Sequence, residues 1–227
     1  MRRYQGEFFS DDKKIQLQGP PLPIYASDHT WFCFFLEWLR VNIGEPNPHS
    51  VTSGVEVPGQ FLDAIRRRIT SLLKASRAGD STAGEDLSEV LATLAKIWSN
   101  NPIVDVPEGQ DGITVVHDYE KQLQTRYKIN RNRAYTVGRK NCGNGIELVR
   151  SNCDDSGASV LTAILIPAPD KQMWVLVPTK NTEVKVRHLQ KELVVMKRRV
   201  ICFPWGINGC YVDLSPWFGL VINTHTT

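Results

Sequence analysis

The chain has 227 residues, of which 41% are hydrophobic and 22% charged, and its formal net charge is +3. This length and composition allow a sizeable core and exclude a wholly disordered chain. The longest apolar runs lie near Trp31–Leu36 and Ala158–Ala168 and fall well short of the ~20 residues that a spanning helix needs, so we expect only peripheral membrane contact.

Residues 1–27 are polar and end in a proline-rich stretch that contains Pro20, Pro21, Pro23 and Tyr25. Proline fixes φ and removes a backbone donor, so this stretch is expected to be extended. We predict a flexible arm over residues 1–27 and one core domain over residues 28–227. The two basic residues at the start are followed by no apolar stretch, so no signal peptide is expected.

The cysteines are odd in number and irregularly spaced (Cys33, Cys142, Cys153, Cys202 and Cys210). This pattern is a poor disulfide framework and indicates an intracellular, reducing compartment.

Residues 28–43 fit two interpretations. Phe32, Phe35 and Leu39 fall on one helical stripe, which Asp28 would cap. The segment is also rich in aromatic residues, and residues 39–43 alternate as a strand does. Both readings stay open.

Two later segments predict helices. Residues 59–77 carry an apolar stripe and follow Pro58, which suits the start of a helix. Residues 85–98 carry a second stripe, after a Thr82–Glu85 sequence that fits a capping box, and Pro102 ends the helical part.

The character changes after residue 102, where short β-type runs alternate with turn residues. The runs are Ile113–Val116, Ile146–Val149, Val160–Ile166, Met173–Val177, Glu183–Val186, Leu193–Phe203, Cys210–Leu214 and Phe218–Ile222. Turns are expected at 111–112, 144–145, 156–157, 167–170 and 208–209. We therefore predict an α+β fold, helical over 28–101 and β-rich over 102–227, with a mostly antiparallel sheet or small sandwich.

Positive charge is concentrated in three segments: on the helix at 59–77, in 121–141, which lacks acidic residues, and in 185–199. Such runs attract phosphate in nucleic acid or lipid head groups, although many charge runs are only solvated faces. Tyr127 and Tyr135 lie within the second run and could stack on bases. The candidate contacts to anionic lipid or nucleic acid are Arg66, Arg67, Lys121, Arg126, Lys128, Arg131, Arg133, Arg139, Lys140, Lys197, Arg198 and Arg199.

The sequence contains no phosphate-binding glycine loop and no nucleophile elbow, and its histidines and cysteines lack the spacing of a metal site. We therefore expect a binding protein without catalytic residues, metal or cofactor. Because catalytic groups can be assembled from distant residues, this expectation rests on pattern alone.

In layout, the chain resembles the matrix proteins of rhabdoviruses. Residues 20–25 are similar to the family's Pro-Pro-x-Tyr late-domain motif, with two extra residues before the tyrosine. Residues 34–41 look like its aromatic first core strand, and Val106–Gly109 precedes a basic stretch, as in some members. The resemblance implies a virion structural protein that coats the inner face of the host membrane, binds the nucleocapsid or RNA and self-associates. It also implies a role in budding and a host partner for the arm.

Phe61–Arg67 is similar to the RNA-binding helix of the influenza non-structural interferon antagonist, and residues 79–82 continue the likeness. This resemblance implies that Arg66 and Arg67 grip the backbone of double-stranded RNA. A third possibility is a globular domain whose ligand is another protein, contacted by the proline-rich arm.

Overall fold

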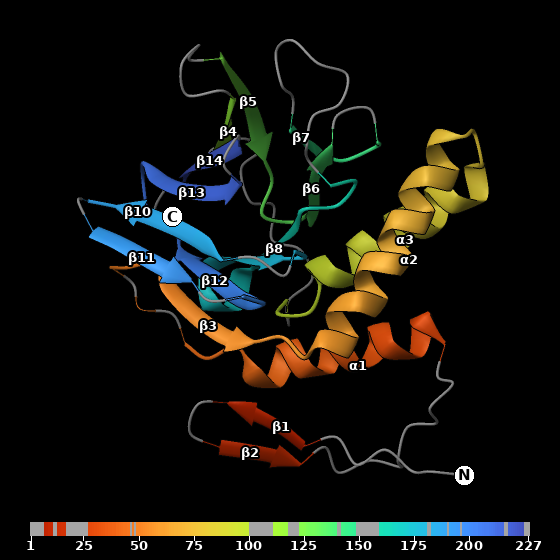
Figure 1. The fold of residues 1–227 in the computed structure, drawn as a ribbon, viewed down its shortest axis with the longest axis horizontal. Helices are drawn as coiled ribbons and strands as arrows, with labels where there is room; N and C mark the ends of the chain where they lie inside the picture. The colour runs from red at the N-terminus through yellow and green to blue at the C-terminus, as the bar shows by residue number, and fades with distance from the viewer. Residues whose placement is uncertain are drawn as a thin grey trace.

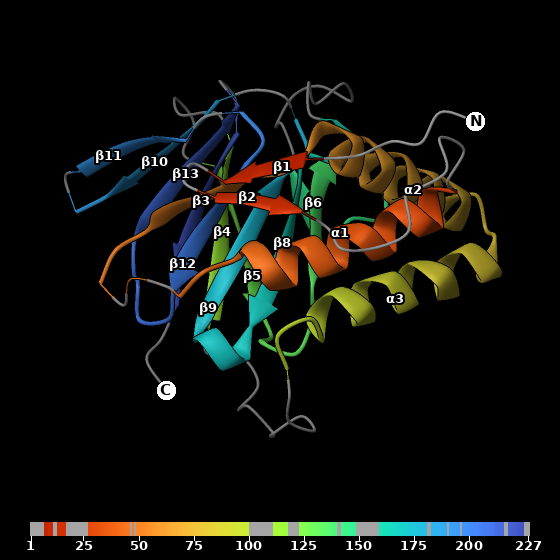
Figure 2. The same ribbon diagram turned by 90° about the horizontal axis from the view of Figure 1, so that it is seen from below.

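The computed structural model describes residues 7–10, 13–16, 27–45, 47, 49–99, 111–117, 123–139, 142–148, 159–180, 183–189, 191–195, 197–215 and 218–224. These residues form three layers, with helices, then an inner sheet, then an outer sheet (Figures 1 and 2). The α+β prediction is confirmed.

Three helices cover one face of the inner sheet: α1 (Asp28–Asn42), α2 (Gly59–Arg77) and α3 (Ser81–Ala95). The inner sheet has the order β3-β12-β9-β8-β6-β7. Its strands are β3 (Thr52–Glu56), β6 (Tyr135–Arg139), β7 (Ile146–Leu148), β8 (Ala163–Ala168), β9 (Met173–Pro178) and β12 (Arg199–Pro204). Only the β6–β7 pair among these is parallel.

The outer sheet is antiparallel throughout, with the order β11-β10-β13-β14-β4-β5. Its strands are β4 (Asp111–His117), β5 (Leu123–Ile129), β10 (Val184–His188), β11 (Lys191–Val195), β13 (Cys210–Ser215) and β14 (Phe218–Asn223). A separate hairpin, β1 (Glu7–Ser10) with β2 (Lys13–Gln16), lies within the segment predicted to be a flexible arm.

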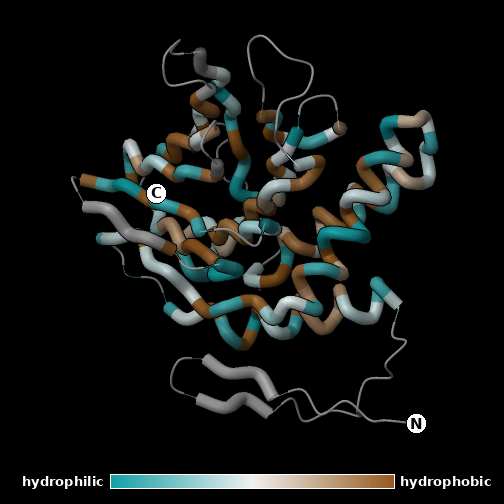
Figure 3. The backbone as a smooth tube through the Cα atoms, in the orientation of Figure 1, coloured by the Kyte–Doolittle hydropathy of each residue, from teal (hydrophilic) through white to brown (hydrophobic). Residues whose placement is uncertain are grey.

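The central strands of the inner sheet are buried on both faces, whereas the strands of the outer sheet are buried on one face only. Every residue of β8 and β9 is buried, because helices cover one face of the inner sheet and the outer sheet covers the other. In β10, by contrast, buried and exposed residues alternate, so the outer sheet has one covered and one open face. The helices likewise alternate hydrophobic and hydrophilic segments (Figure 3).

The ambiguous segment at 28–43 is a helix, and the expected aromatic strand at 34–41 is wrong. Ser27, rather than Asp28, caps the helix by accepting a hydrogen bond from Thr30 N. Phe35 and Leu39 are fully buried in the core between helices and sheet, and Trp38 packs on Phe61 of α2. Burial of the helical stripe therefore outweighs the strand-like alternation of residues 39–43.

The bounds of the helix at 59–77 are confirmed, but α3 begins earlier than predicted. Asp80 is its N-cap and accepts a hydrogen bond from Ala83 N, at 3.1 Å, so the proposed capping box at 82–85 is wrong. Gly79 precedes this cap with φ +95°, which ends α2 and lets the chain reverse.

Five of the described strands were missed: β1 and β2 in the segment predicted as an arm, and β3, β5 and β6. The turn expected at 111–112 lies inside β4. The long run predicted at 193–203 is divided into β11 and β12. Arg198 adopts φ +63° between these strands, which breaks the extended backbone.

Candidate anion-binding site

The basic run at 121–141 does not form one surface, and the assignment of Arg131 to an exterior contact is wrong. Arg131 is 4% exposed and lies between the two sheets. Its Nε and Nη2 donate to the two carboxylate oxygens of Asp111 at 2.7 and 2.9 Å. A guanidinium held in this way is unavailable to an external phosphate.

Two tryptophans complete this buried cluster. Trp174 Nε1, from β9 of the inner sheet, donates to Asp111 at 2.9 Å. The guanidinium of Arg131 lies 3.8 Å from the ring centroid of Trp205. Because Asp111 belongs to β4 of the outer sheet, the cluster joins the two sheets by charge-assisted hydrogen bonds.

The other described members of the run lie at three separate places. Arg126 and Lys128 are exposed on β5, Arg133 is exposed in the turn before β6, and Arg139 is half-buried at the end of β6. Lys121 and Lys140 lie outside the described residues. The described cations of residues 126–139 therefore do not form a single continuous positive face.

The tyrosines interleaved in the run have structural contacts. The Tyr127 hydroxyl donates to Glu147 O at 3.3 Å and accepts from Glu147 N at 3.2 Å, which links β5 of the outer sheet to β7 of the inner sheet. The Tyr135 hydroxyl accepts from Asn130 N at 2.7 Å. Burial raises the pKa of both phenols.

The arginines expected to grip RNA on α2 are exposed, and each has an acidic neighbour. Arg66 is 3.1 Å from Asp63, and Arg67 is 3.0 Å from Asp28 of α1. The late-domain-like residues Pro20, Pro21, Pro23 and Tyr25 lie outside the described residues.

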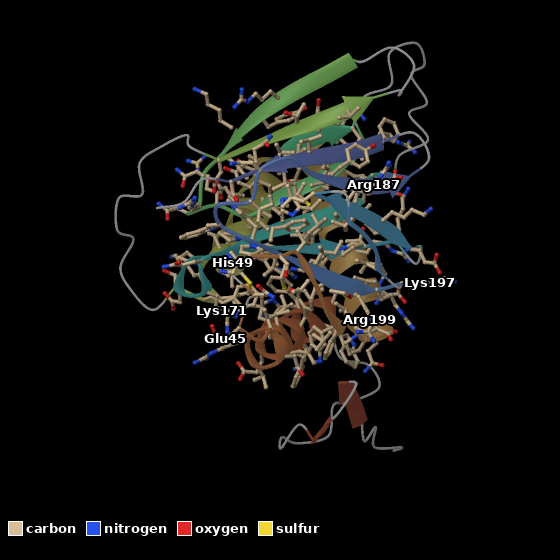
Figure 4. All side chains as sticks on the ribbon, turned by 90° about the vertical axis from the view of Figure 1, so that its left-hand side faces the viewer. Glu45, His49, Lys171, Arg187, Lys197 and Arg199 are labelled. Carbon is tan, nitrogen blue, oxygen red and sulfur yellow. The ribbon has the colours of Figure 1, made fainter. Side chains whose placement is uncertain are left out.

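The cluster at 197–199 is partly used in holding the edge of the inner sheet. Arg198 is 2.7 Å from Glu56, and Arg199 Nη1 donates to Gly54 O at 3.3 Å, so both reach β3. Lys197 is exposed (Figure 4). On the other side of this view, Lys171 pairs with Glu45 at 3.0 Å.

A site that the sequence did not indicate lies where β6 and β9 end. Arg139 N donates to Ser159 O at 2.9 Å, and Thr179 N donates to Thr162 O at 2.9 Å. Arg139 and Lys180 therefore lie on opposite sides of the segment 159–162. Partial burial and the charge of Arg139 lower the pKa of Lys180. We call this arrangement the Arg139–Lys180 site.

The backbone beneath this site is packed too tightly for a side chain at 138. A Cβ on Gly138 would lie 2.1 Å from Val160 O and 2.8 Å from Asn144 Nδ2. The Asn144 amide nitrogen donates to both Arg139 O and Val160 O, at 3.1 and 2.9 Å. These contacts fix the direction in which the chain leaves β6 and therefore the base of the Arg139 side chain.

Two buried polar atoms close to the site have no hydrogen-bond partner among the described residues: Asn144 Oδ1 and Thr162 Oγ1. Their residues are 8% and 2% exposed. Buried polar groups are normally satisfied by protein, water or ligand. Thr162 Oγ1 is therefore a buried hydroxyl beside the segment 159–162 for which the described residues supply no hydrogen-bond partner.

The described residues give little support for a metal site, a reactive thiol or a membrane-spanning helix. Among the described residues, no three histidine, cysteine or acidic side chains are grouped so that they could hold a metal ion. Burial raises the pKa of the Cys202 and Cys210 thiols to about 11 and about 12, so these two are poor nucleophiles. No described helix has the length and apolar character needed to cross a membrane.

Comparison with known proteins gives no family. No family model matches the chain, and no curated protein matches it. Among solved structures, the FHA domain of the CT664 protein from Chlamydia trachomatis is similar at 14% identity and a TM-score of 0.33. The match covers 51% of this chain and 98% of that domain, and no conclusion about function rests on a likeness of this size.

Proposed function

We propose that this protein binds a phosphate-bearing partner, without catalysing a reaction on it, through the Arg139–Lys180 site. The observation that supports the proposal is the placement of Arg139 and Lys180 on either side of the segment 159–162, where β6 and β9 end. Partial burial and repulsion from Arg139 both disfavour the charged form of Lys180. A phosphate between them would relieve this repulsion and offer hydrogen-bond acceptors to both.

The proposal gives the binding a definite pH dependence. A bound anion favours the charged ammonium and therefore raises the pKa of Lys180 above its value in the free protein. Between the two pKa values the complex holds more protons than the free protein, so binding takes up protons there. The affinity is therefore greatest at lower pH and falls as the pH rises through this window.

Arg139→Gln and Lys180→Gln should each abolish the specific part of the stabilisation that inorganic phosphate gives the native protein. A ligand at ten times its Kd stabilises by about 1.4 kcal/mol. Thermal unfolding in phosphate, matched in ionic strength with sodium chloride, measures this increment. Calorimetric titration in two buffers of different ionisation enthalpy measures the proton uptake, which should be lost in Lys180→Gln.

Phosphate also stabilises proteins by exclusion from their surface, so a matched variant is needed. Lys74→Gln removes an exposed cation from α2 and should respond to phosphate as the parent does. Equal responses of the parent, Lys180→Gln and Lys74→Gln would refute the site.

A second candidate is the matrix-type coat protein, which binds anionic membrane. The observation that favours it is Leu189, which is 77% exposed at the turn between β10 and β11, and which has φ +47°. Arg187 and Lys185 lie behind it on β10 and are exposed. An apolar tip backed by cations suits insertion between anionic lipid head groups.

Leu189→Asn should weaken binding to phosphatidylserine vesicles by about tenfold, because burying a leucine side chain contributes ~1.5–3 kcal/mol. Asparagine tolerates positive φ better than leucine, so the variant should fold. Flotation at low salt measures the effect, with Val41→Asn as the control, since Val41 is exposed on α1. If the two variants bind vesicles equally, the hairpin does not insert.

The double-stranded RNA reading through Arg66 and Arg67 stays a prediction. The acidic neighbours Asp63 and Asp28 compensate part of their charge, so we rank it below the two candidates above. Nucleocapsid binding, self-association and a host partner for the arm likewise stay predictions.

A further inference from the structure

The open face of the outer sheet carries an aromatic side chain between two groups of cations. The antiparallel register aligns Arg187, Tyr211, Val221, Thr114 and Arg126 in one row across five neighbouring strands. Adjacent strands are ~4.8 Å apart, so the row spans roughly 19 Å. All five residues lie on the face away from the inner sheet, because their strand neighbours are buried between the sheets.

The ring of Tyr211, the aromatic residue in this row, packs flat against the backbone of the sheet. A Cβ on Gly219 would be 2.1 Å from the Tyr211 hydroxyl and 2.4 Å from its Cζ. Gly219 is the diagonal neighbour of Tyr211 on β14. The ring therefore covers the glycine, and the guanidinium of Arg187 lies 4.9 Å from its centroid.

The cations lie at both ends of the row. Lys185 and Arg187 are exposed on β10, and Arg126 and Lys128 are exposed on β5. Arg126 also lies over a glycine, since a Cβ on Gly112 would be 3.5 Å from its Nε. Among the described side chains of these rows, Asp213 is the carboxylate, 3.6 Å from Arg187. Four cations and one carboxylate are thus described in these rows, and Glu192 of β11 stands opposite Arg187 in the register.

We propose that this face binds single-stranded nucleic acid, with a base stacked on the Tyr211–Arg187 pair and the backbone phosphates lying along the cations at its ends. Aromatic rings and guanidinium planes both stack on bases, and single strands expose the bases that duplexes hide. A membrane surface fits less well, because the aliphatic side chains of this face, Val116 and Val221, are short and only partly exposed, and the exposed Leu189 lies at the hairpin tip instead. The inference is independent of the Arg139–Lys180 site.

Fluorescence anisotropy with a labelled oligouridylate of about 12 nucleotides tests the proposal. Tyr211→Leu should lower the affinity about fivefold or more, and Tyr211→Phe should leave it close to that of the parent, since it keeps the ring. Arg126→Gln with Lys128→Gln should make the plot of log affinity against log salt shallower by about 1.4, because two phosphate contacts are lost. Lys96→Gln, at the C-cap of α3 in the helical layer, is the matched control.

Photo-cross-linking tests whether the bound oligonucleotide lies at Tyr211. An oligonucleotide that carries 5-iodouracil should, on irradiation, form its cross-link on the β13 peptide that contains Tyr211, as located by mass spectrometry. The Lys96→Gln control should give the same cross-link as the parent. Equal affinities of the parent and Tyr211→Leu, tighter binding of a duplex than of the single strand, or charge variants that weaken binding only to phosphatidylserine vesicles would each overturn the proposal.

Discussion

Asp111→Asn should lower the free energy of unfolding by about 3–5 kcal/mol, because it leaves the buried Arg131 guanidinium without its counter-charge. Arg131 is 4% exposed, and water cannot replace the lost carboxylate oxygen. Trp174 Nε1 also donates to that carboxylate, so the contact between the two sheets weakens as well. Denaturant unfolding followed by tryptophan fluorescence measures the change.

Two further variants separate this effect from a general loss of charge. Arg133→Gln removes an exposed cation two residues from Arg131 and should change the stability by less than about 0.5 kcal/mol. Asp111→Leu with Arg131→Met removes both buried charges together and should regain much of the loss. A cost below ~1 kcal/mol for Asp111→Asn would show that the pair is not a main link between the sheets.

Gly138→Ala should destabilise the protein by about 3 kcal/mol or more, because the added methyl overlaps a backbone atom. The new Cβ would lie 2.1 Å from Val160 O, which can yield only if the chain at 159–162 moves. Movement there displaces the strand to which Arg139 N donates, so the response to phosphate should also be reduced. Thermal unfolding with and without phosphate measures both effects.

Gly44→Ala is the matched control, since its Cβ would have nothing within 4 Å. It should leave the stability unchanged, or raise it by about 0.4–1 kcal/mol through a loss of freedom in the unfolded chain. Similar melting temperatures for Gly138→Ala and Gly44→Ala would contradict the packing around β6.

The parts of the fold that follow local pattern could be predicted from the sequence. The apolar stripe that contains Phe61 and Leu73 defines α2, and both residues are fully buried. The continuous apolar run at 173–177 is a strand buried on both faces. In both cases, burial of one periodic set of side chains provides the driving force, and that set is visible in the sequence.

The sequence does not show in this way which basic residues are buried and which are exposed. Arg131 and Arg133 are alike in the sequence, yet one is buried and the other exposed. The difference depends on Asp111, which β4 brings opposite the end of β5. Lys180 was not singled out because its lowered pKa depends on burial and on the charge of Arg139, which arise only when β6, β8 and β9 have assembled. A single sequence records neither neighbour.

The Tyr127 hydroxyl protects one sheet edge against pairing with a strand of another copy of the protein. β7 is three residues long and lies at the edge of the inner sheet, where unpaired backbone groups invite a foreign strand. The phenol occupies both the N–H and the C=O of Glu147, the central residue of this edge. Aggregation or self-association by strand addition is therefore directed to the remaining edges of the two large sheets, β3, β5 and β11.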